Sequence, residues 1–159
     1  FGETAYHHRW SKAGQHEFTP VGQEDLRHWI DLLTVVRHDQ VRSGEQLAGL
    51  AHQVLERYRT AGRILRTVSV PRREQGVAEH LAVALLRAPD GVEWVFARFL
   101  LVEGRGMVVV RSRRFPGLPT QVTEAATEWL RAHGPRTEET LVGWVVPAPS
   151  LFDRLPRTR

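Results

Sequence analysis

Residues 79–113 read EHLAVALLRAPDGVEWVFARFLLVEGRGMVVVRSR, which is three strand-like segments joined by two short turns. The segments are 79–87, 93–102 and 107–113, and the turns are Pro89-Asp90-Gly91 and Gly104-Arg105-Gly106. Glycine-containing turns of this length join neighbouring antiparallel strands as hairpins. The stretch therefore predicts an antiparallel meander, which a segment at 64–70 extends to four strands through a turn at 71–76.

The alternation of side chains in this meander indicates that both faces of the sheet are covered. Leu81, Val83 and Leu85 lie on one face of their strand, because successive side chains of a strand point to opposite sides. Ala82 and Ala84 lie on the other face, where small side chains allow a helix to approach closely. We therefore expect helices on both faces.

Two helices flank the meander. The first is predicted to begin after Ser43, which forms a capping box with Gln46, and to end in a left-handed residue at Gly62. Its apolar stripe consists of Leu47, Leu50, Ala51, Val54, Leu55 and Tyr58. The second is predicted to begin near Pro119 and to end at His133-Gly134-Pro135, since glycine followed by proline ends helices.

Further strands are predicted on either side of these elements. Residues 7–19 have the pattern of a hairpin that turns near Ala13-Gly14, and residues 28–37 that of another strand. Residues 24–36 also have helical spacing, so a helix stays an alternative there, although their β-branched residues favour a strand. Residues 140–146 are predicted to form a short closing strand.

Together these elements predict an α+β fold in which helices pack on the faces of an antiparallel sheet of six to seven strands. The length of 159 residues suits one domain, expected at 1–147, followed by a flexible Pro/Arg-rich tail at 148–159. No apolar run approaches the ~18 residues typical of a membrane span. The chain has no cysteine, which excludes disulfides, thiolate metal sites and cysteine nucleophiles.

The basic charge of the chain is concentrated in its last residues. Lys and Arg number 22 against 18 acids, but without the three arginines of residues 154–159 the formal charge falls from +4 to +1. A nucleic-acid-binding domain carries its basic residues as a dense patch on a folded face. The composition therefore argues against a nucleic-acid partner.

No motif for catalysis, a metal or a cofactor is evident. His7 and His8 point to opposite faces of a strand, and His8 could meet His16 across the hairpin without a third ligand. The acidic pairs Glu24-Asp25 and Glu138-Glu139 are typical of the starts of local elements. The sequence thus favours a protein that is not an enzyme, with an enzyme whose site assembles only in three dimensions as the alternative.

One group of residues is a candidate binding surface. It consists of Arg66, Trp94, Phe96, Arg98, Arg111 and Arg113. Arg111 and Arg113 share a strand face, and a row of guanidinium groups beside aromatic rings can bind a carboxylate, a phosphate or an acidic protein. The alternative is that these arginines lie over the sheet and pair with Glu93 and Glu103.

Several short motifs carry a resemblance to known proteins. They are Glu17-Phe18-Thr19-Pro20 with Gly22-Gln23 and Trp29, Ser69-Val70-Pro71, Ala78-Glu79-His80-Leu81, Phe96-Ala97-Arg98-Phe99 and Trp129-Leu130. The motifs resemble uncharacterised exported proteins of proteobacteria, and the order of elements resembles the PsbP-like fold. That fold is an α/β/α sandwich found in exported photosystem-associated subunits, bacterial lipoproteins and chaperone-like adaptors, which mostly bind partners.

The resemblance implies a non-catalytic binding or accessory protein of the bacterial cell envelope, periplasmic or secreted. It would contact a protein partner or a small anionic ligand through the arginine and aromatic residues. An immunity or adaptor protein that covers a partner's surface is a further alternative. The start at Phe1 instead of Met fits an upstream signal or lipoprotein leader, and with it a lipid anchor.

Overall fold

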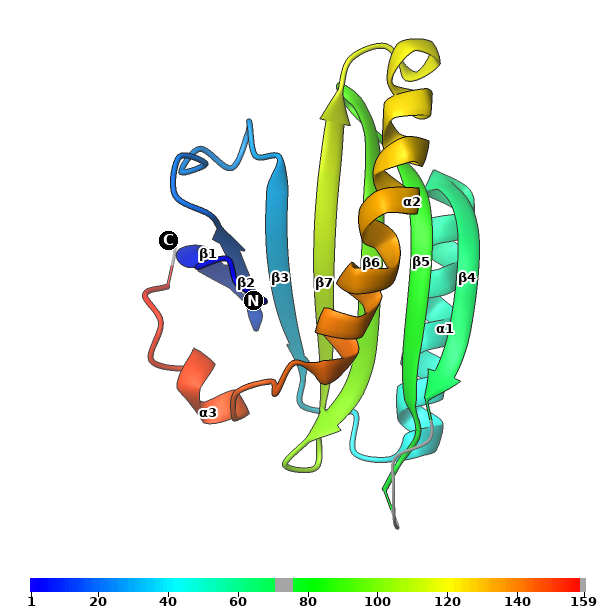
Figure 1. The fold of residues 1–159 in the computed structure, drawn as a ribbon. Coiled ribbons are helices and arrows are strands. Elements are labelled where there is room, and N and C mark those ends of the chain that lie inside the picture. The colour runs from blue at the N-terminus through cyan, green and yellow to red at the C-terminus, as the bar shows by residue number, and fades with distance from the viewer. Residues whose placement is uncertain (71–75, 158–159) are drawn as a thin grey trace.

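A computed structural model of the chain describes residues 1–70 and 76–157. In these residues seven strands form one antiparallel sheet in the order β1-β2-β3-β7-β6-β5-β4 (Figure 1). The elements are β1 (His7–Lys12), β2 (Gln15–Thr19), β3 (Asp31–His38), α1 (Gly44–Ala61), β4 (Gly62–Val70), β5 (Glu79–Ala88), β6 (Gly91–Val102), β7 (Arg105–Pro116), α2 (Pro119–Gly143) and α3 (Pro149–Phe152). The α+β class and the antiparallel sheet are confirmed, whereas most of the turn predicted at 71–76 lies outside the described residues.

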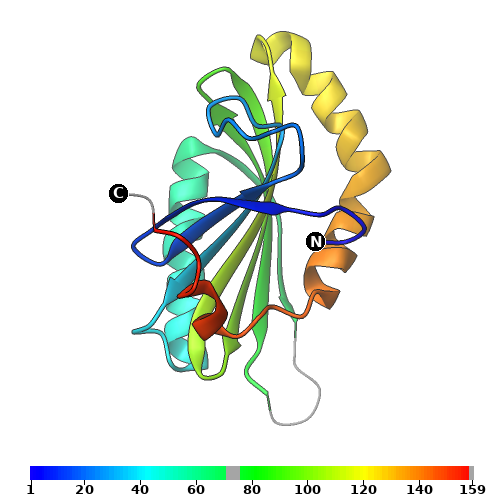
Figure 2. The same cartoon turned by 90° about the vertical axis from the view of Figure 1, so that its left-hand side faces the viewer.

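The two long helices cover opposite faces of the sheet, so that strands β4 to β7 lie between them (Figure 2). Under α1 the core contains Leu47, Ala82 and Phe99, and the small alanines stand where close approach to a helix was predicted. Under α2 the core contains Val83 and Phe96, among others. Strand β6 contributes to both cores, because its alternate side chains point to alternate faces.

The N-terminal part of the chain forms strands, as predicted. The hairpin turns at Ala13 and Gly14, which have positive φ angles of 50° and 82°. Strand β3 begins at Asp31, so the helix considered for residues 24–36 is wrong. This strand pairs with β7, in a register that places Asp31 opposite Arg113 and Leu33 opposite Arg111.

The ends of α1 are partly as predicted. The Ser43 hydroxyl accepts a hydrogen bond from the Gln46 backbone N–H, and the Gln46 side chain reaches back to accept one from the N–H of Arg42 at 2.7 Å. Gly62 does not end the helix in a left-handed conformation, because its φ is −177° and it begins β4. A Cβ at this position would lie 2.1 Å from the Leu85 carbonyl oxygen. Glycine is therefore required here by the close approach to β5.

Helix α2 is longer than predicted. It continues through Pro135 to Gly143, so the predicted end at 133–135 and the predicted strand at 140–146 are both wrong. Proline inside a helix removes one backbone hydrogen bond. Leu141, in the turns after Pro135, is completely buried against the sheet, and such burial offsets the lost bond.

Both ends of the chain cover the part of the sheet that α2 leaves open. The same core as α2 also contains Phe1 and Tyr6 from the N-terminus, and Trp144 and Phe152 from the C-terminal segment. The single domain at 1–147 and the flexible tail stay predictions, but Phe152 is only 6% exposed and belongs to the packed structure. Among the described residues, no helix is long and apolar enough to cross a membrane.

Candidate functional site

Two arginines on β7 share one carboxylate on β3. Arg111 donates from Nη2 to Oδ1 of Asp31 at 2.5 Å, and Arg113 donates from Nη1 to Oδ2 at 2.6 Å. The antiparallel register explains this geometry, because it sets Asp31 directly opposite Arg113 and diagonal to Arg111. Two positive charges thus meet one negative charge. We call Asp31, Arg111 and Arg113 the arginine cluster, and its formal charge is positive.

Aromatic rings enclose this cluster. The Arg111 guanidinium carbon lies 5.6 Å from the centroid of the Tyr6 ring, and that of Arg113 lies 5.9 Å from Trp129, distances at which cations interact with rings. Burial raises the pKa of Tyr6 above its usual value, although the neighbouring Arg111 acts to lower it. The Tyr6 hydroxyl therefore keeps its proton at neutral pH and can donate a hydrogen bond.

Arg111 opens onto a cavity of about 470 Å³ between the N-terminal segment and α2, which we call the arginine cavity. Its lining includes Tyr6, Arg111, Trp129, His133, Arg136 and Thr137. Arg136 lies 3.2 Å from Glu3, the one acidic residue of the lining, and both side chains are exposed. Exposed ion pairs contribute little, so Arg136 can exchange this partner for another anion.

A smaller cavity of about 160 Å³ adjoins it, which we call the apolar cavity. The two cavities share Phe1 and Tyr6 as lining residues. The other lining residues of the apolar cavity are Phe18, Leu33, Val35, Trp144, Pro147 and Phe152. The lining side chains carry no charge, so this space suits an apolar group.

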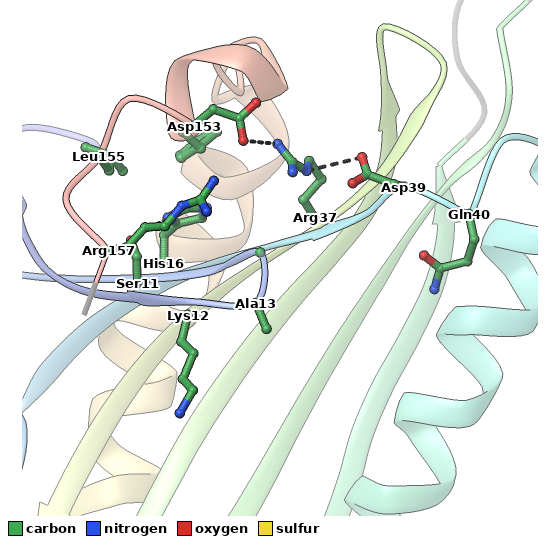
Figure 3. Close-up of a pocket in the computed structure, with 12 residues that line it drawn as sticks. Ser11, Lys12, Ala13, His16, Arg37, Asp39, Gln40, Asp153, Leu155 and Arg157 are labelled. Carbon is green, nitrogen blue, oxygen red and sulfur yellow. Dashed lines mark hydrogen bonds and ion pairs between the residues drawn. The ribbon is translucent and has the colours of Figure 1, made fainter. Parts of the chain in front are cut away.

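A third cavity of about 400 Å³ lies between the β1–β2 hairpin and the C-terminal segment (Figure 3). Arg37 lies between Asp153 at 2.5 Å and Asp39 at 3.1 Å, so its charge is compensated on two sides. Lys12 points away from Arg37 in this view (Figure 3). Arg157 lines the same space, which we call the hairpin cavity, so three basic and two acidic side chains surround it.

His8 and His16 meet across the hairpin through a shared hydroxyl. Ser11 Oγ lies 2.7 Å from Nε2 of His8 and 2.6 Å from Nδ1 of His16. Within residues 1–70 and 76–157, no three His, Asp or Glu side chains gather as metal ligands would. A serine beside a histidine is also the arrangement of an activated nucleophile, but Ser11 is 2% exposed, which leaves little of it for a substrate to reach.

This buried histidine predicts a pH dependence of stability. Burial, the nearby His8 ring and the Arg37 guanidinium lower the pKa of His16 below its usual 6.5. The unfolded chain then takes up a proton at a higher pH than the folded chain does, so stability is complete above pH 6.5 and decreases as the pH falls below it. We expect the thermal midpoint to fall between pH 7.5 and about 5.5, measured by circular dichroism.

The variant His16→Gln keeps a hydrogen-bonding group beside Ser11 and removes the titration. It should flatten that part of the profile, leaving the contribution of His38, whose pKa burial also lowers. A profile as steep in His16→Gln as in the wild type would show that other groups cause the effect.

Three of the six predicted site residues are buried beneath α2. Trp94 is 4% exposed, Phe96 is fully buried and Arg98 is 8% exposed. Trp94 bonds the Ala126 carbonyl and Phe96 contacts Trp129, both in the predicted part of α2, whereas Arg98 lies under the turns beyond the predicted end. They therefore lie in the interior, and the surface that was predicted to contain them is wrong in this part.

Arg98 makes buried hydrogen bonds that hold the end of α2 on the sheet. It donates from Nε to Oε2 of Glu79 at 2.7 Å and from Nη1 to the carbonyl oxygens of Leu141 and Trp144 at 2.8 and 2.7 Å. It thus binds the carbonyls at the C-terminal end of α2, where a positive charge is favourable. Its acidic partner is Glu79 and not the predicted Glu93 or Glu103.

Arg66 is exposed on the edge strand β4, where it lies 3.5 Å from Glu138. It is therefore separate from the arginine cluster. Of the predicted residues, Arg111 and Arg113 form the cluster, and Phe96 and Trp94 lie directly opposite them on β6.

Sequence reasoning missed several residues of this region. Asp31 had a signal, because it precedes Leu33 and Val35 at a spacing of two and so places an acid on an apolar strand face. Tyr6 and Arg136 had no local signal. They reach the arginine cavity only because the N-terminal segment folds over the sheet and α2 continues past Pro135.

Comparison with known proteins found one weak structural similarity to report and no family. No protein-family model matches the chain, and no curated protein matches it. The crystal structure of human STARD10 is similar with a TM-score of 0.38 and 11% identity, over 84% of this chain and 71% of that chain. The predicted PsbP-like resemblance is therefore corrected: human STARD10 is a weak structural neighbour, and nothing found points to PsbP.

Proposed function

We propose that this chain is a non-catalytic binding module that holds a small anionic ligand in the arginine cavity. The observation that carries the proposal is the sharing of one carboxylate, Asp31, by two arginines at a partly buried position. An excess positive charge there is screened less by salt than a charge at the surface, so it attracts an anion more strongly.

The cavity supplies donors as well as charge. The two terminal nitrogens of Arg111 donate to Asp31 and to the Ser112 carbonyl, and the guanidinium also donates to the Tyr6 hydroxyl. A guanidinium has more N–H donors than these three bonds use. Arg136 and the Tyr6 hydroxyl lie around the same space. Charge-assisted hydrogen bonds from guanidinium groups to a carboxylate or phosphate are among the stronger ones in proteins.

Two parts of the expected function stay predictions from the sequence alone. One is the location in the bacterial envelope, and the other is a protein partner in place of a small ligand. An immunity or adaptor role belongs with the second.

The proposal is tested with inorganic phosphate, followed by NMR at the indole N–H of Trp129. We expect saturable shifts of this signal and of the backbone signals of residues 133–137, at ionic strength held constant with chloride. Replacing Arg136 by Gln should weaken the affinity about 3- to 10-fold, since it removes one charged donor at an exposed site.

Arg131→Gln is the matched control, because Arg131 is an exposed arginine on the same helix that does not line the cavity. It should bind phosphate like the wild type. An equal loss of phosphate affinity in both variants would show that only the net charge of the protein matters. NMR shifts confined to residues of the hairpin cavity would contradict the proposed site.

A further inference from the structure

We infer that the ligand of the arginine cavity is a small amphiphilic organic anion whose apolar part enters the apolar cavity. The inference rests on the proposed function and adds the class of ligand to it. Its basis is the contact between one cationic cavity and one apolar cavity across the rings of Phe1 and Tyr6.

One face of β3 changes from charged to apolar along the strand, as an amphiphilic ligand lying beside it requires. Asp31, Leu33 and Val35 lie on one face in steps of two residues, which is about 7 Å each. Asp31 belongs to the arginine cluster, whereas Leu33 and Val35 line the apolar cavity. Arg111 lies opposite Leu33, so an anion bound to it is next to the wall of the apolar cavity.

The size of the apolar cavity limits the ligand. Its 160 Å³ corresponds to roughly five water molecules at about 30 Å³ each. Most of its lining is apolar, so water finds few hydrogen-bond partners there and an apolar guest is favoured. The space suits a short alkyl chain or one ring, and it is too small for the two long chains of a membrane phospholipid.

The wall between the two cavities consists of side chains. The rings of Phe1 and Tyr6 are half buried and meet edge to face at 6.3 Å. Rotation of an aromatic ring would open a passage without any change in the backbone of the sheet. The Tyr6 hydroxyl, which keeps its proton, is then available to the ligand's head group.

The inference is tested with the sodium salts of acetate, butyrate, hexanoate and octanoate, titrated as monomers and followed at the Trp129 indole N–H. All four anions carry the same charge, so differences in their affinity arise from the length of the alkyl chain. We expect the affinity to increase about three- to fourfold per CH₂ group until the cavity is filled, and then to level off.

A cavity-filling variant tests whether the alkyl chain of the ligand occupies the apolar cavity. Val35→Phe adds volume at a fully buried lining position, and it should reduce the affinity for hexanoate to near that for acetate. Affinity for acetate, which reaches only the arginine cavity, should be unchanged and would show that the variant is folded. The control is Val36→Phe, on the opposite face of the same strand, which should behave like the wild type.

If Val35→Phe does not fold, Phe18→Trp fills the same cavity from a half-buried position on β2. Vesicles of an anionic phospholipid should not compete with hexanoate, and competition would show that a membrane lipid is the ligand instead.

The outcomes separate the two proposals. If acetate and phosphate bind but chain length has no effect, or has the same effect in Val35→Phe, the amphiphilic ligand is excluded and the anion site stands. If none of the anions shifts the Trp129 signal, the proposed function fails as well.

Discussion

Replacement of Arg98 by Met is expected to destabilise the fold by about 3–5 kcal/mol. The guanidinium is buried, and it bonds the Glu79 carboxylate and the carbonyls of Leu141 and Trp144 at the end of α2. Methionine keeps much of the aliphatic volume but removes the charge, so Glu79 stays buried without this ion pair. Urea unfolding, followed by tryptophan fluorescence, measures the loss of free energy.

The exposed pair of Arg66 and Glu138 provides the matched control. Arg66→Met should cost less than about 1 kcal/mol, because the Arg66 side chain is 59% exposed. The double variant Arg98→Met with Glu79→Met should recover part of the loss, since neither charge then remains buried. A cost for Arg98→Met no larger than that for Arg66→Met would contradict the structural role.

Truncation of Phe99 to Ala is expected to cost about 3–5 kcal/mol. Phe99, on strand β6, is fully buried in the core between α1 and the sheet. The small side chains of Ala82 and Ala97 beside it cannot fill the space that the ring would leave. Thermal and urea unfolding both report this change.

Leu50→Ala serves as its comparison, because Leu50 packs on the same core but is half exposed. The cost should be clearly smaller than for Phe99, although the deletion again removes an apolar side chain. Equal costs at the two positions would mean that α1 does not pack as described.

The meander and α1 could be predicted because their signals are local. Alternation from Leu81 to Leu85 and the turns at Pro89-Asp90-Gly91 and Gly104-Arg105-Gly106 determine strands and hairpins over a few residues. The capping box at Ser43 does the same for the start of α1. Each of these signals needs no information from a distant part of the chain.

The length of α2 could not be predicted in this way. Gly134 and Pro135 are strong local signals for a helix end, but the burial of Leu141 outweighs them. The error propagated to the candidate site, because the extra turns of α2 bury Arg98. Its partner Glu79 begins the neighbouring strand, and only the register of β5 with β6 brings the two together.

The arginine cluster was half predictable. Spacing alone placed Arg111 and Arg113 on one face of their strand. That Asp31 neutralises part of their charge depends on the pairing of β3 with β7, for which the sequence carries no local signal. The cavity above them depends further on the path of residues 1–6.

The pairing of β3 with β7 also has a consequence for the order of folding. Asp31 and Arg111, which bond across it, are 80 positions apart in the chain. Closing so long a loop lowers the conformational entropy of the chain before any stabilising contact forms, and long-range pairings therefore slow folding. During synthesis β1 to β3 leave the ribosome first, yet their central neighbour β7 emerges only much later. Until then the apolar side chains of Leu33 and Val35 stay accessible, so the nascent N-terminal strands are a segment that a holding chaperone would bind.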